Sequence, residues 1–209
     1  MCGRFAFWSD KNNILDHYEL EDTSEYYTGY NVTPSYEIAV IRNQDSKELA
    51  NCHWGLIPHW AKDTKIKPVN TRSDGVATKP FFRDSFKKRR CLIPANGYYE
   101  WSVSNGKKQP YFIHLEDSKL FSFAGVWSSW DTPEKTIESC AIITTNSNQY
   151  LSKVHDRMPV IISSNEYDTW LDKGGEEMLK PYTGMMQAYP ISNRVNSPKS
   201  QGPELIQPL

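Results

Sequence analysis

The residue with the clearest capacity for chemistry is the cysteine at position 2, in the opening Met1-Cys2-Gly3-Arg4. Because the side chain after the initiator methionine is small, we expect Met1 to be removed, so that Cys2 becomes the N-terminus. An amine with an ordinary pKa of about 8 and a thiol with an ordinary pKa of about 8.5 then lie on adjacent carbons. Together they can capture an aldehyde, the amine forming a Schiff base that the thiol closes into a five-membered thiazolidine. The thiol alone could instead attack an amide or ester carbonyl, and the remaining alternative is a buried cysteine that packs as a small apolar side chain.

An N-terminal nucleophile needs groups that orient the carbonyl, move protons and hold the substrate. Glu100 lies among aromatic residues in Gly97-Tyr98-Tyr99-Glu100-Trp101, where burial would raise its pKa and suit it to proton transfer. His155 can act as an acid or a base near neutral pH, and Arg157 would reach the same side of an extended segment, where it can clamp a phosphate. The alternatives are a solvent-facing Glu100 and a turn in which Asp156 merely bonds backbone amides.

Four further residues could bind rather than react. Asn70 offers an uncharged donor and acceptor close to the basic Arg72, although asparagine is also common in turns. Trp60 and Pro34 could each present a flat surface on which a base stacks, a contact worth about 1–3 kcal/mol per base. The alternative for both is packing in the core.

The composition is that of a globular protein, and we expect residues 1–209 to form one domain. Hydrophobic residues make up 38% of the 209 and aromatic residues 13%, enough to bury a sizeable core. No stretch approaches the roughly 20 apolar residues that span a bilayer, and no secretory signal is recognisable. The four cysteines are widely spread without CxxC or CxxH pairs, so we expect reduced thiols in a cytoplasmic protein, with no disulfide frame, metal site or cofactor.

Charge is distributed unevenly along the chain. The formal net charge of −1 argues against a protein that coats nucleic acid indiscriminately. Segment 62–90, however, has ten basic and three acidic residues, a net +7, so the remainder carries −8. Such asymmetry fits a local phosphate-binding face on an otherwise acidic body. For the run 87–90 alone, a solvated helix face is the competing interpretation.

Hydrophobic patterning predicts many short strands and a few helices. A helix capped by Ser9, a second over 81–88, and a third opened by a capping box of Ser163 and Glu166 and running to about Leu171 are expected. Asn105-Gly106 predicts a hairpin turn. Strands are expected at 37–41, 49–54, 98–103, 110–115, 121–128, 137–144 and 187–195, with a short buried run at 158–162. The pattern indicates an α+β fold with a bent, barrel-like, mostly antiparallel sheet core and short peripheral helices.

Seven motifs then occur in a specific order: Met1-Cys2-Gly3-Arg4-Phe5, Tyr30-Asn31-Val32-Thr33-Pro34, Trp54-Gly55-Leu56-Ile57-Pro58, Asn70-Thr71-Arg72-Ser73, Gly97-Tyr98-Tyr99-Glu100-Trp101, Val154-His155-Asp156-Arg157-Met158-Pro159 and Gly202-Pro203-Glu204-Leu205-Ile206-Gln207-Pro208. The chain resembles the SOS-response-associated peptidase (SRAP) family from residue 2 to the C-terminus. Members of that family crosslink covalently to abasic sites in single-stranded DNA and so shield the lesion during the DNA damage response.

The resemblance implies a role for each motif residue. Cys2 takes the sugar aldehyde into a thiazolidine, in lyase-like Schiff-base chemistry, and Asn70 positions the Cys2 terminus and the sugar oxygen. Glu100 handles the amine proton and the sugar hydroxyl and could assist reversal, while His155 assists ring opening and Schiff-base formation. The DNA contacts implied are phosphate contacts by Arg4, Arg72 and Arg157 and base contacts by Trp60 and Pro34. The fold implied is a single α+β domain with a barrel-like core.

Two other functions stay open at this point. One is a thiol peptidase, acting on itself or on peptides with Cys2 as an N-terminal nucleophile, as the family's name suggests. The other is a non-catalytic single-strand binder that uses the basic segment alone. We expect a monomer in a bacterial or phage-type nucleoid setting, with single-stranded DNA carrying an abasic site as its partner and no membrane partner.

Overall fold

A closed ring of five strands forms the centre of the fold. Our computed structural model describes residues 2–104 and 106–209, with the backbone alone at residue 104. Around the ring, β4 neighbours β3, then β6, β9 and β10, and β10 returns to β4. All pairs are antiparallel except β10 with β4. The bounds are β3 Glu37–Asn43, β4 Lys47–Trp54, β6 Arg90–Ala95, β9 Phe121–Asp131 and β10 Thr136–Asn146. The predicted barrel-like core is confirmed.

Close packing inside this barrel depends on small residues at specific places. Gly125 in β9 faces Cys91 across the pair with β6. A Cβ at position 125 would lie 2.9 Å from Cys91 Sγ and 2.8 Å from Ile93 Cδ1, closer than real Cβ atoms approach. A larger residue at position 125 would therefore have to displace the Cys91 and Ile93 side chains. The four cysteines are all free and buried.

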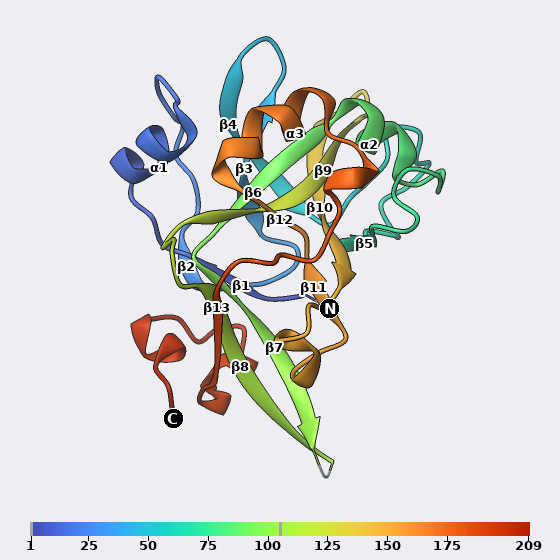
Figure 1. Cartoon of the computed structure of the whole chain (residues 1–209). Coiled ribbons are helices and arrows are strands. Elements are labelled where there is room, and N and C mark those ends of the chain that lie inside the picture. Colours follow the sequence, from blue (N-terminus) through green and yellow to red (C-terminus); the bar gives the residue numbers. More distant parts are fainter. Residues whose placement is uncertain (1, 105) are drawn as a thin grey trace.

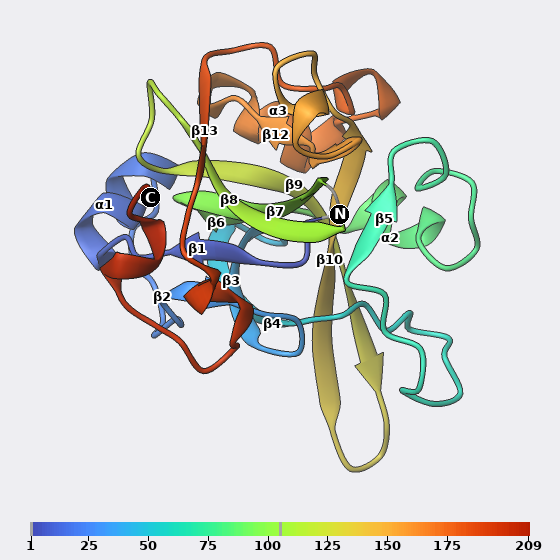
Figure 2. The same cartoon turned by 90° about the horizontal axis from the view of Figure 1, so that it is seen from below.

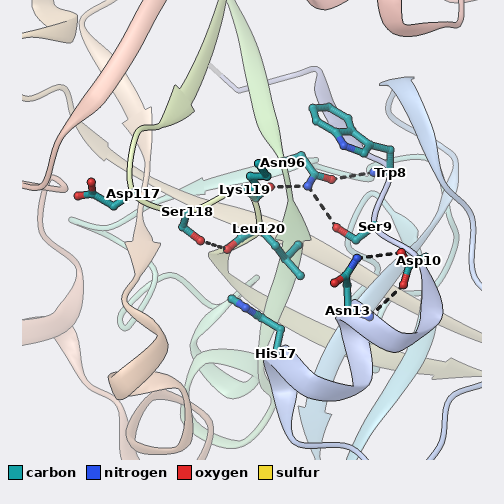
Figure 3. A pocket seen from close by; sticks show the side chains of 10 residues that line it. All are labelled: Trp8, Ser9, Asp10, Asn13, His17, Asn96, Asp117, Ser118, Lys119 and Leu120. Carbon is teal, nitrogen blue, oxygen red and sulfur yellow. Dashed lines mark hydrogen bonds between the residues drawn. The ribbon is translucent and has the colours of Figure 1, made fainter.

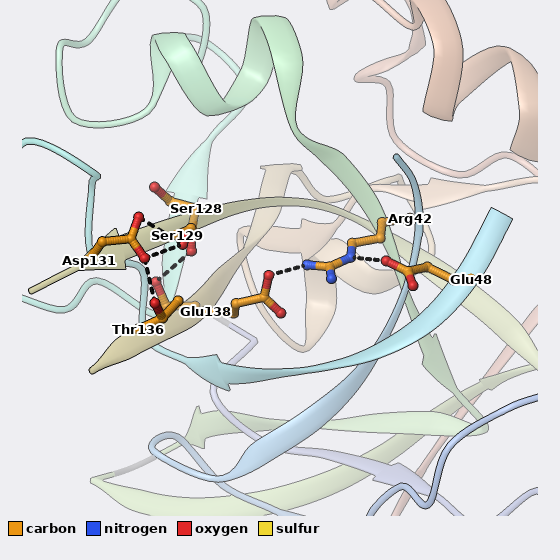
Figure 4. A network of polar contacts seen from close by, with 8 residues as sticks. Arg42, Glu48, Ser128, Ser129, Asp131, Thr136 and Glu138 are labelled. Atoms are coloured by element: carbon orange, nitrogen blue, oxygen red, sulfur yellow. Dashed lines mark hydrogen bonds and ion pairs between the residues drawn. The ribbon is translucent and has the colours of Figure 1, made fainter. Parts of the chain in front are cut away.

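One buried arginine joins three barrel strands. Arg42 of β3 donates from Nε to Glu48 of β4 and from Nη1 to Glu138 of β10, each at 2.7 Å (Figure 4). Its guanidinium also lies 4.2 Å from the centre of the Trp127 ring. These carboxylates raise the pKa of Arg42 although burial opposes this. A charge exposed by only 6% requires such partners, because an unpaired buried charge is costly.

A second sheet of five strands packs below the barrel, in the order β13-β8-β7-β1-β2 (Figure 1). Its bounds are β1 Phe5–Phe7, β2 Gly29–Val32, β7 Gly97–Ser104, β8 Lys107–Leu115 and β13 Met186–Pro190. β7 and β8 form the long predicted hairpin, in register up to Ser104 opposite Lys107. Asn105 of the predicted turn lies outside the described residues.

Three short strands complete the sheets: β5 Asn70–Arg72, β11 Arg157–Pro159 and β12 Ile161–Ile162. The helices are peripheral and short, as expected: α1 Lys11–Tyr18, α2 Arg83–Lys88 and α3 Tyr167–Lys173, with the 3-10 turns η1 Leu151–Lys153, η2 Ser164–Glu166, η3 Glu176–Met178, η4 Asn193–Asn196 and η5 Pro203–Ile206. Within the described ranges, no helix is both long and apolar enough to cross a membrane.

Three local predictions were wrong in detail. The cap of α1 is Asp10, which accepts from Asn13 N at 3.0 Å, rather than Ser9. No side-chain hydrogen bond caps η2 at Ser163, so the predicted capping box is not formed and a 3-10 turn precedes α3. The late strand stops at Pro190 instead of continuing to residue 195, because proline cannot donate to a ladder and the chain then turns into η4.

Arg90, the last basic residue of segment 62–90, is half-buried and binds backbone carbonyls of the protein itself. Its guanidinium donates to the carbonyls of Trp170 (2.7 Å), Leu171 (3.4 Å) and Asp172 (2.8 Å) in α3. It also donates to the carbonyls of Phe86 (2.7 Å) and Lys87 (3.1 Å) in α2. One cation thus satisfies the carbonyl ends of two helices, whose dipoles favour a positive charge there.

We therefore predict that Arg90→Ala destabilises the protein by about 2–3 kcal/mol, since it leaves several half-buried carbonyls unpaired. Urea unfolding monitored by tryptophan fluorescence measures this loss. The control is Lys88→Ala, which removes an exposed cation from the same helix end and is expected to change stability by less than about 0.5 kcal/mol. Equal effects of the two substitutions would show that Arg90 has no special structural role.

Candidate active site

The strands that carry the predicted site residues meet where the barrel adjoins the second sheet. β5 pairs with β10 in parallel, with Asn70 opposite Ile142, and β11 pairs with β10 antiparallel, with Arg157 opposite Asn146. β5 and β10 lie side by side in Figure 2, and β11 lies antiparallel beside the end of β10, after the chain has passed through η1 (Figure 1). β7 approaches from the second sheet, so residues far apart in sequence converge on the segment that precedes β1.

Cys2 is held in the interior by a polar contact as well as by apolar packing. Its exposed fraction is 0%, and its backbone carbonyl accepts a hydrogen bond of 2.8 Å from Asn70 Nδ2. Burial and the nearby Glu100 carboxylate raise the pKa of the Cys2 thiol. The thiol is therefore neutral near pH 7. The segment is tied to β7 by the hydrogen bond from Tyr99 N to the Arg4 carbonyl, at 3.0 Å.

Glu100 and His155, the two proposed proton carriers, lie next to each other. His155 Nε2 is 3.9 Å from Glu100 Oε2, and His155 Nδ1 accepts from Arg157 N at 3.0 Å. Asp156 Oδ1 lies 2.9 Å from the same Nδ1. Burial raises the pKa of Glu100, which is 3% exposed, although the neighbouring imidazole lowers it in part. Glu100 is thus a buried carboxyl group, and the alternative of a solvent-facing carboxylate is wrong.

This raised pKa gives a testable stability effect. The folded protein holds the Glu100 proton more tightly than the unfolded chain, whose glutamates have a pKa of about 4.3. Stability is then fully present below the unfolded pKa and is lost as pH rises through the interval up to the folded pKa. We predict that Glu100→Gln, which cannot ionise, is more stable than the wild type near neutral pH. The two should converge below about pH 4 in urea denaturation series. Identical stability at both ends of the series would contradict the burial assigned to this carboxyl.

Two buried polar atoms near Cys2 have no hydrogen-bond partner within the described chain. They are Asn70 Oδ1 and the Tyr98 hydroxyl, and Tyr98 shares a face of β7 with Glu100 because side chains alternate along a strand. Leaving such atoms unpaired costs about 1–3 kcal/mol each. Both atoms are available for hydrogen bonds with a molecule bound at Cys2.

The three predicted phosphate-binding arginines lie in different environments. Arg72 is exposed and forms a two-point ion pair with Asp74, with Nη2 2.6 Å from Oδ2 and Nε 2.9 Å from Oδ1. Arg157 Nη2 donates to the Thr144 hydroxyl, which itself donates to the Thr71 carbonyl of β5 at 3.0 Å. Sequence reasoning did not single out Thr144, which is buried in β10 and places Arg157 beside β5.

Arg4, in contrast to Arg72, is held by neutral groups. Its Nη1 donates to Asn31 Oδ1 at 2.8 Å and to the Val195 carbonyl at 2.6 Å. Its guanidinium also lies 5.8 Å from the centre of the Trp101 ring. Burial lowers the pKa of Arg4, but the group stays protonated because arginine does not lose its proton in proteins.

The two predicted stacking residues are placed differently. Trp60 is 51% exposed, on the loop between β4 and β5, and stands edge-on to Phe81 with ring centres 6.0 Å apart. Its indole is therefore an exposed aromatic surface rather than part of the core. Pro34 is half-buried at the end of β2. Most basic residues of segment 62–90 remain exposed around β5 and α2, and the two exceptions are the half-buried Arg89 and Arg90.

A separate pocket of about 430 Å³ lies beside α1, between Trp8 and Leu120 (Figure 3). Its polar side chains bond mostly to one another or to backbone. Asn96 accepts from Trp8 N at 2.7 Å and donates to Ser9 Oγ at 3.2 Å, while Asp10 accepts from Asn13. None of the predicted site residues lines this pocket. This pocket is therefore separate from the predicted site.

Comparison with known proteins agrees with the motif analysis. Residues 1–198 match the family described as SOS response associated peptidase (SRAP), and the chain belongs to this family. Over 99% of both chains it is 41% identical to "Abasic site processing protein YoqW" of Bacillus subtilis. It is 30% identical to "Abasic site processing protein HMCES" of Xenopus tropicalis, over 88% of this chain and 67% of that one.

The fold is also found in a solved structure. The crystal structure of a protein from Bacteroides thetaiotaomicron superposes with a TM-score of 0.87 at 28% identity, and the match covers the whole of both chains. The resemblance predicted from seven motifs is thus confirmed at the level of family and fold.

Proposed function

We propose that this protein captures abasic sites in single-stranded DNA covalently, through a thiazolidine formed by Cys2 after Met1 is removed. The adduct shields the lesion during the DNA damage response. The observation that carries the proposal is the convergence of Cys2, Asn70, Glu100 and His155 from four separate parts of the chain. The names of the relatives, which are abasic site processing proteins, support the same substrate.

The chemistry balances without an oxidant, metal or cofactor. The neutral α-amine of Cys2 adds to the aldehyde carbon of the ring-opened sugar, and the resulting carbinolamine loses water to give an imine. The thiol sulfur then adds to the imine carbon, and the thiol proton passes to the nitrogen. One C–N and one C–S bond form and one water leaves. A neutral thiol, as burial of Cys2 favours, carries the proton that this last step needs.

Glu100 and His155 supply the proton transfers. A carboxyl with a raised pKa can accept a proton from the attacking amine and return one to the departing hydroxyl. His155, 3.9 Å away, can exchange protons with it and assist opening of the sugar ring. Glu100→Gln should therefore slow adduct formation while leaving DNA affinity nearly unchanged, although it stabilises the fold.

Access to the buried thiol requires only a local change. Cys2 precedes β1 in a segment without regular secondary structure. Few backbone hydrogen bonds must break for this N-terminal segment to move away, so exposing the thiol costs much less free energy than global unfolding. In the proposed complex Arg4, Arg72 and Arg157 hold phosphates. Trp60 and Pro34 contact neighbouring bases, so that the lesion faces Cys2. The protein acts as a monomer in this proposal.

The proposal is tested by incubating the Met1-processed protein with a single-stranded oligonucleotide that carries one abasic site. A band of lower mobility that survives heating is expected on a denaturing gel. The matched control is a tetrahydrofuran analogue of the abasic site, which has the same shape but no aldehyde and should give no band. A band of equal intensity with the analogue, or none with the abasic site, refutes the proposal.

A further inference from the structure

The C-terminal segment meets the N-terminal motif at one buried side chain, Asn31 of β2. Its exposed fraction is 0%. The two hydrogens of Asn31 Nδ2 are shared among three carbonyl oxygens, those of Val195 (3.3 Å), Ser197 (3.0 Å) and Ser200 (3.0 Å). Asn31 Oδ1 accepts from Arg4 Nη1 at 2.8 Å. A single amide thus links Arg4 to a segment from the far end of the chain.

The same segment is fastened at two more points. Gln201 exchanges two hydrogen bonds of 3.1 Å with the backbone N–H and carbonyl of Asn31. Trp101 Nε1 donates to Asn196 Oδ1 at 2.8 Å, and the ring of Trp101 is the one that lies beneath the Arg4 guanidinium. Residues 195–201 therefore border the Arg4 side chain, directly at the Val195 carbonyl and otherwise through Asn31 and Trp101.

The partners of Arg4 matter because of their charge. Arg72 and Arg42 each contact a carboxylate, which offsets the positive charge. Arg4 is held by an amide oxygen, a carbonyl oxygen and an aromatic ring, and no ion pair to it is found within the described residues. Its orientation is fixed while its full positive charge is kept for an external anion.

We propose that Asn31 is a positioning residue, which together with residues 195–201 holds Arg4 for a DNA phosphate next to the lesion. The C-terminal segment is accordingly part of the DNA-binding site although it need not touch DNA itself. This inference rests on the proposed function for the identity of the ligand, and it adds a residue and a segment to which that function assigns no role.

The experiment measures binding of an undamaged single-stranded oligonucleotide by fluorescence anisotropy across a salt series, so that no covalent step is involved. Arg4→Ala and Asn31→Ala are each expected to weaken binding by about tenfold or more. Each should also reduce the slope of log affinity against log salt by about 0.7, the value for one phosphate contact to a single strand. The double variant should lose nothing further, because both substitutions remove the same contact.

Two further variants separate positioning from folding. Asn31→Asp keeps an acceptor of the same shape but places a carboxylate on Arg4 and loses the donor to the carbonyls of residues 195–201, so it should also lower the salt slope. Asn96→Ala removes another buried asparagine that joins chain segments, but beside α1 and away from Cys2. It should reduce thermal stability without changing DNA binding.

Wild-type affinity and slope in both Asn31 variants, or losses that multiply in the double variant, overturn the inference. A weakened slope in Asn96→Ala overturns it as well, since the effect would then be one of general stability. Failure of the proposed function has a different signature. In that case the wild type binds the strand in an Arg4-dependent manner but forms no adduct with an abasic site.

Discussion

Replacing Cys2 with serine is expected to reduce the heat-stable DNA adduct to below about 1% of the wild-type yield, because the ring-closing nucleophile is lost. Methionine removal still occurs before serine, so the α-amine remains and the imine still forms. Closure by the wild-type thiol is intramolecular, with an effective concentration of about 10⁵ M or more that no added thiol can match. The imine left in the Cys2→Ser variant hydrolyses on heating.

Reduction with borohydride provides the control for this variant. It converts the imine into a stable secondary amine, so Cys2→Ser should give a band only when borohydride is present. Its affinity for undamaged single strands should equal that of the wild type. A heat-stable adduct without reduction would mean that the thiol takes no part in the final bond.

Blocking the amine is expected to have an equally large effect by a different route. When residues precede Cys2, its nitrogen is part of a peptide bond, whose lone pair is delocalised into the carbonyl and cannot form an imine. A protein with a permanent N-terminal extension should therefore form no adduct, and borohydride should trap nothing. This distinguishes it from the Cys2→Ser variant, in which trapping persists.

The extension itself must be excluded as a steric cause. A cleavable extension that leaves Cys2 as the first residue provides the comparison, since cleavage should restore the wild-type yield. If the uncleaved protein formed the adduct at the normal rate, the thiol would be acting alone. Turnover of peptide substrates that depends on Cys2 would then favour the thiol peptidase.

Much of the barrel and of the hairpin could be predicted because their signals are local. The alternating patterns before Trp54, around Asn105-Gly106 and through 121–144 each gave a strand within a few residues of its observed bounds. Two errors are local and concern the helix caps at Asp10 and Ser163, and the third lies where the chain makes a long-range contact. The chain after Pro190 has the composition of a strand, but residues 195–201 are held by Asn31 in another conformation.

The residues of the candidate site could be predicted from the sequence, but their burial and their contacts could not. Motif order brought out Cys2, Asn70, Glu100 and His155, whereas the sequence left the burial of Glu100 open and carried no signal that Thr144 places Arg157. Net charge likewise placed Arg90 with the exposed cations, since composition does not distinguish a guanidinium bound to backbone carbonyls from one in solvent. Asn31 was recognised only as part of the Tyr30–Pro34 motif, and no role was predicted for it.

The most direct test of the account is the intact mass of the species formed with an abasic oligonucleotide, followed by mass spectrometry of its N-terminal peptide. We predict a mass equal to that of the Met1-processed protein plus the oligonucleotide less one water. The N-terminal peptide should carry the remnant of the sugar on Cys2, and the Cys2 sulfur should no longer be alkylatable. A Cys2 peptide that stays free and alkylatable, or a joined species in which the link lies on any other residue, would contradict the central claim.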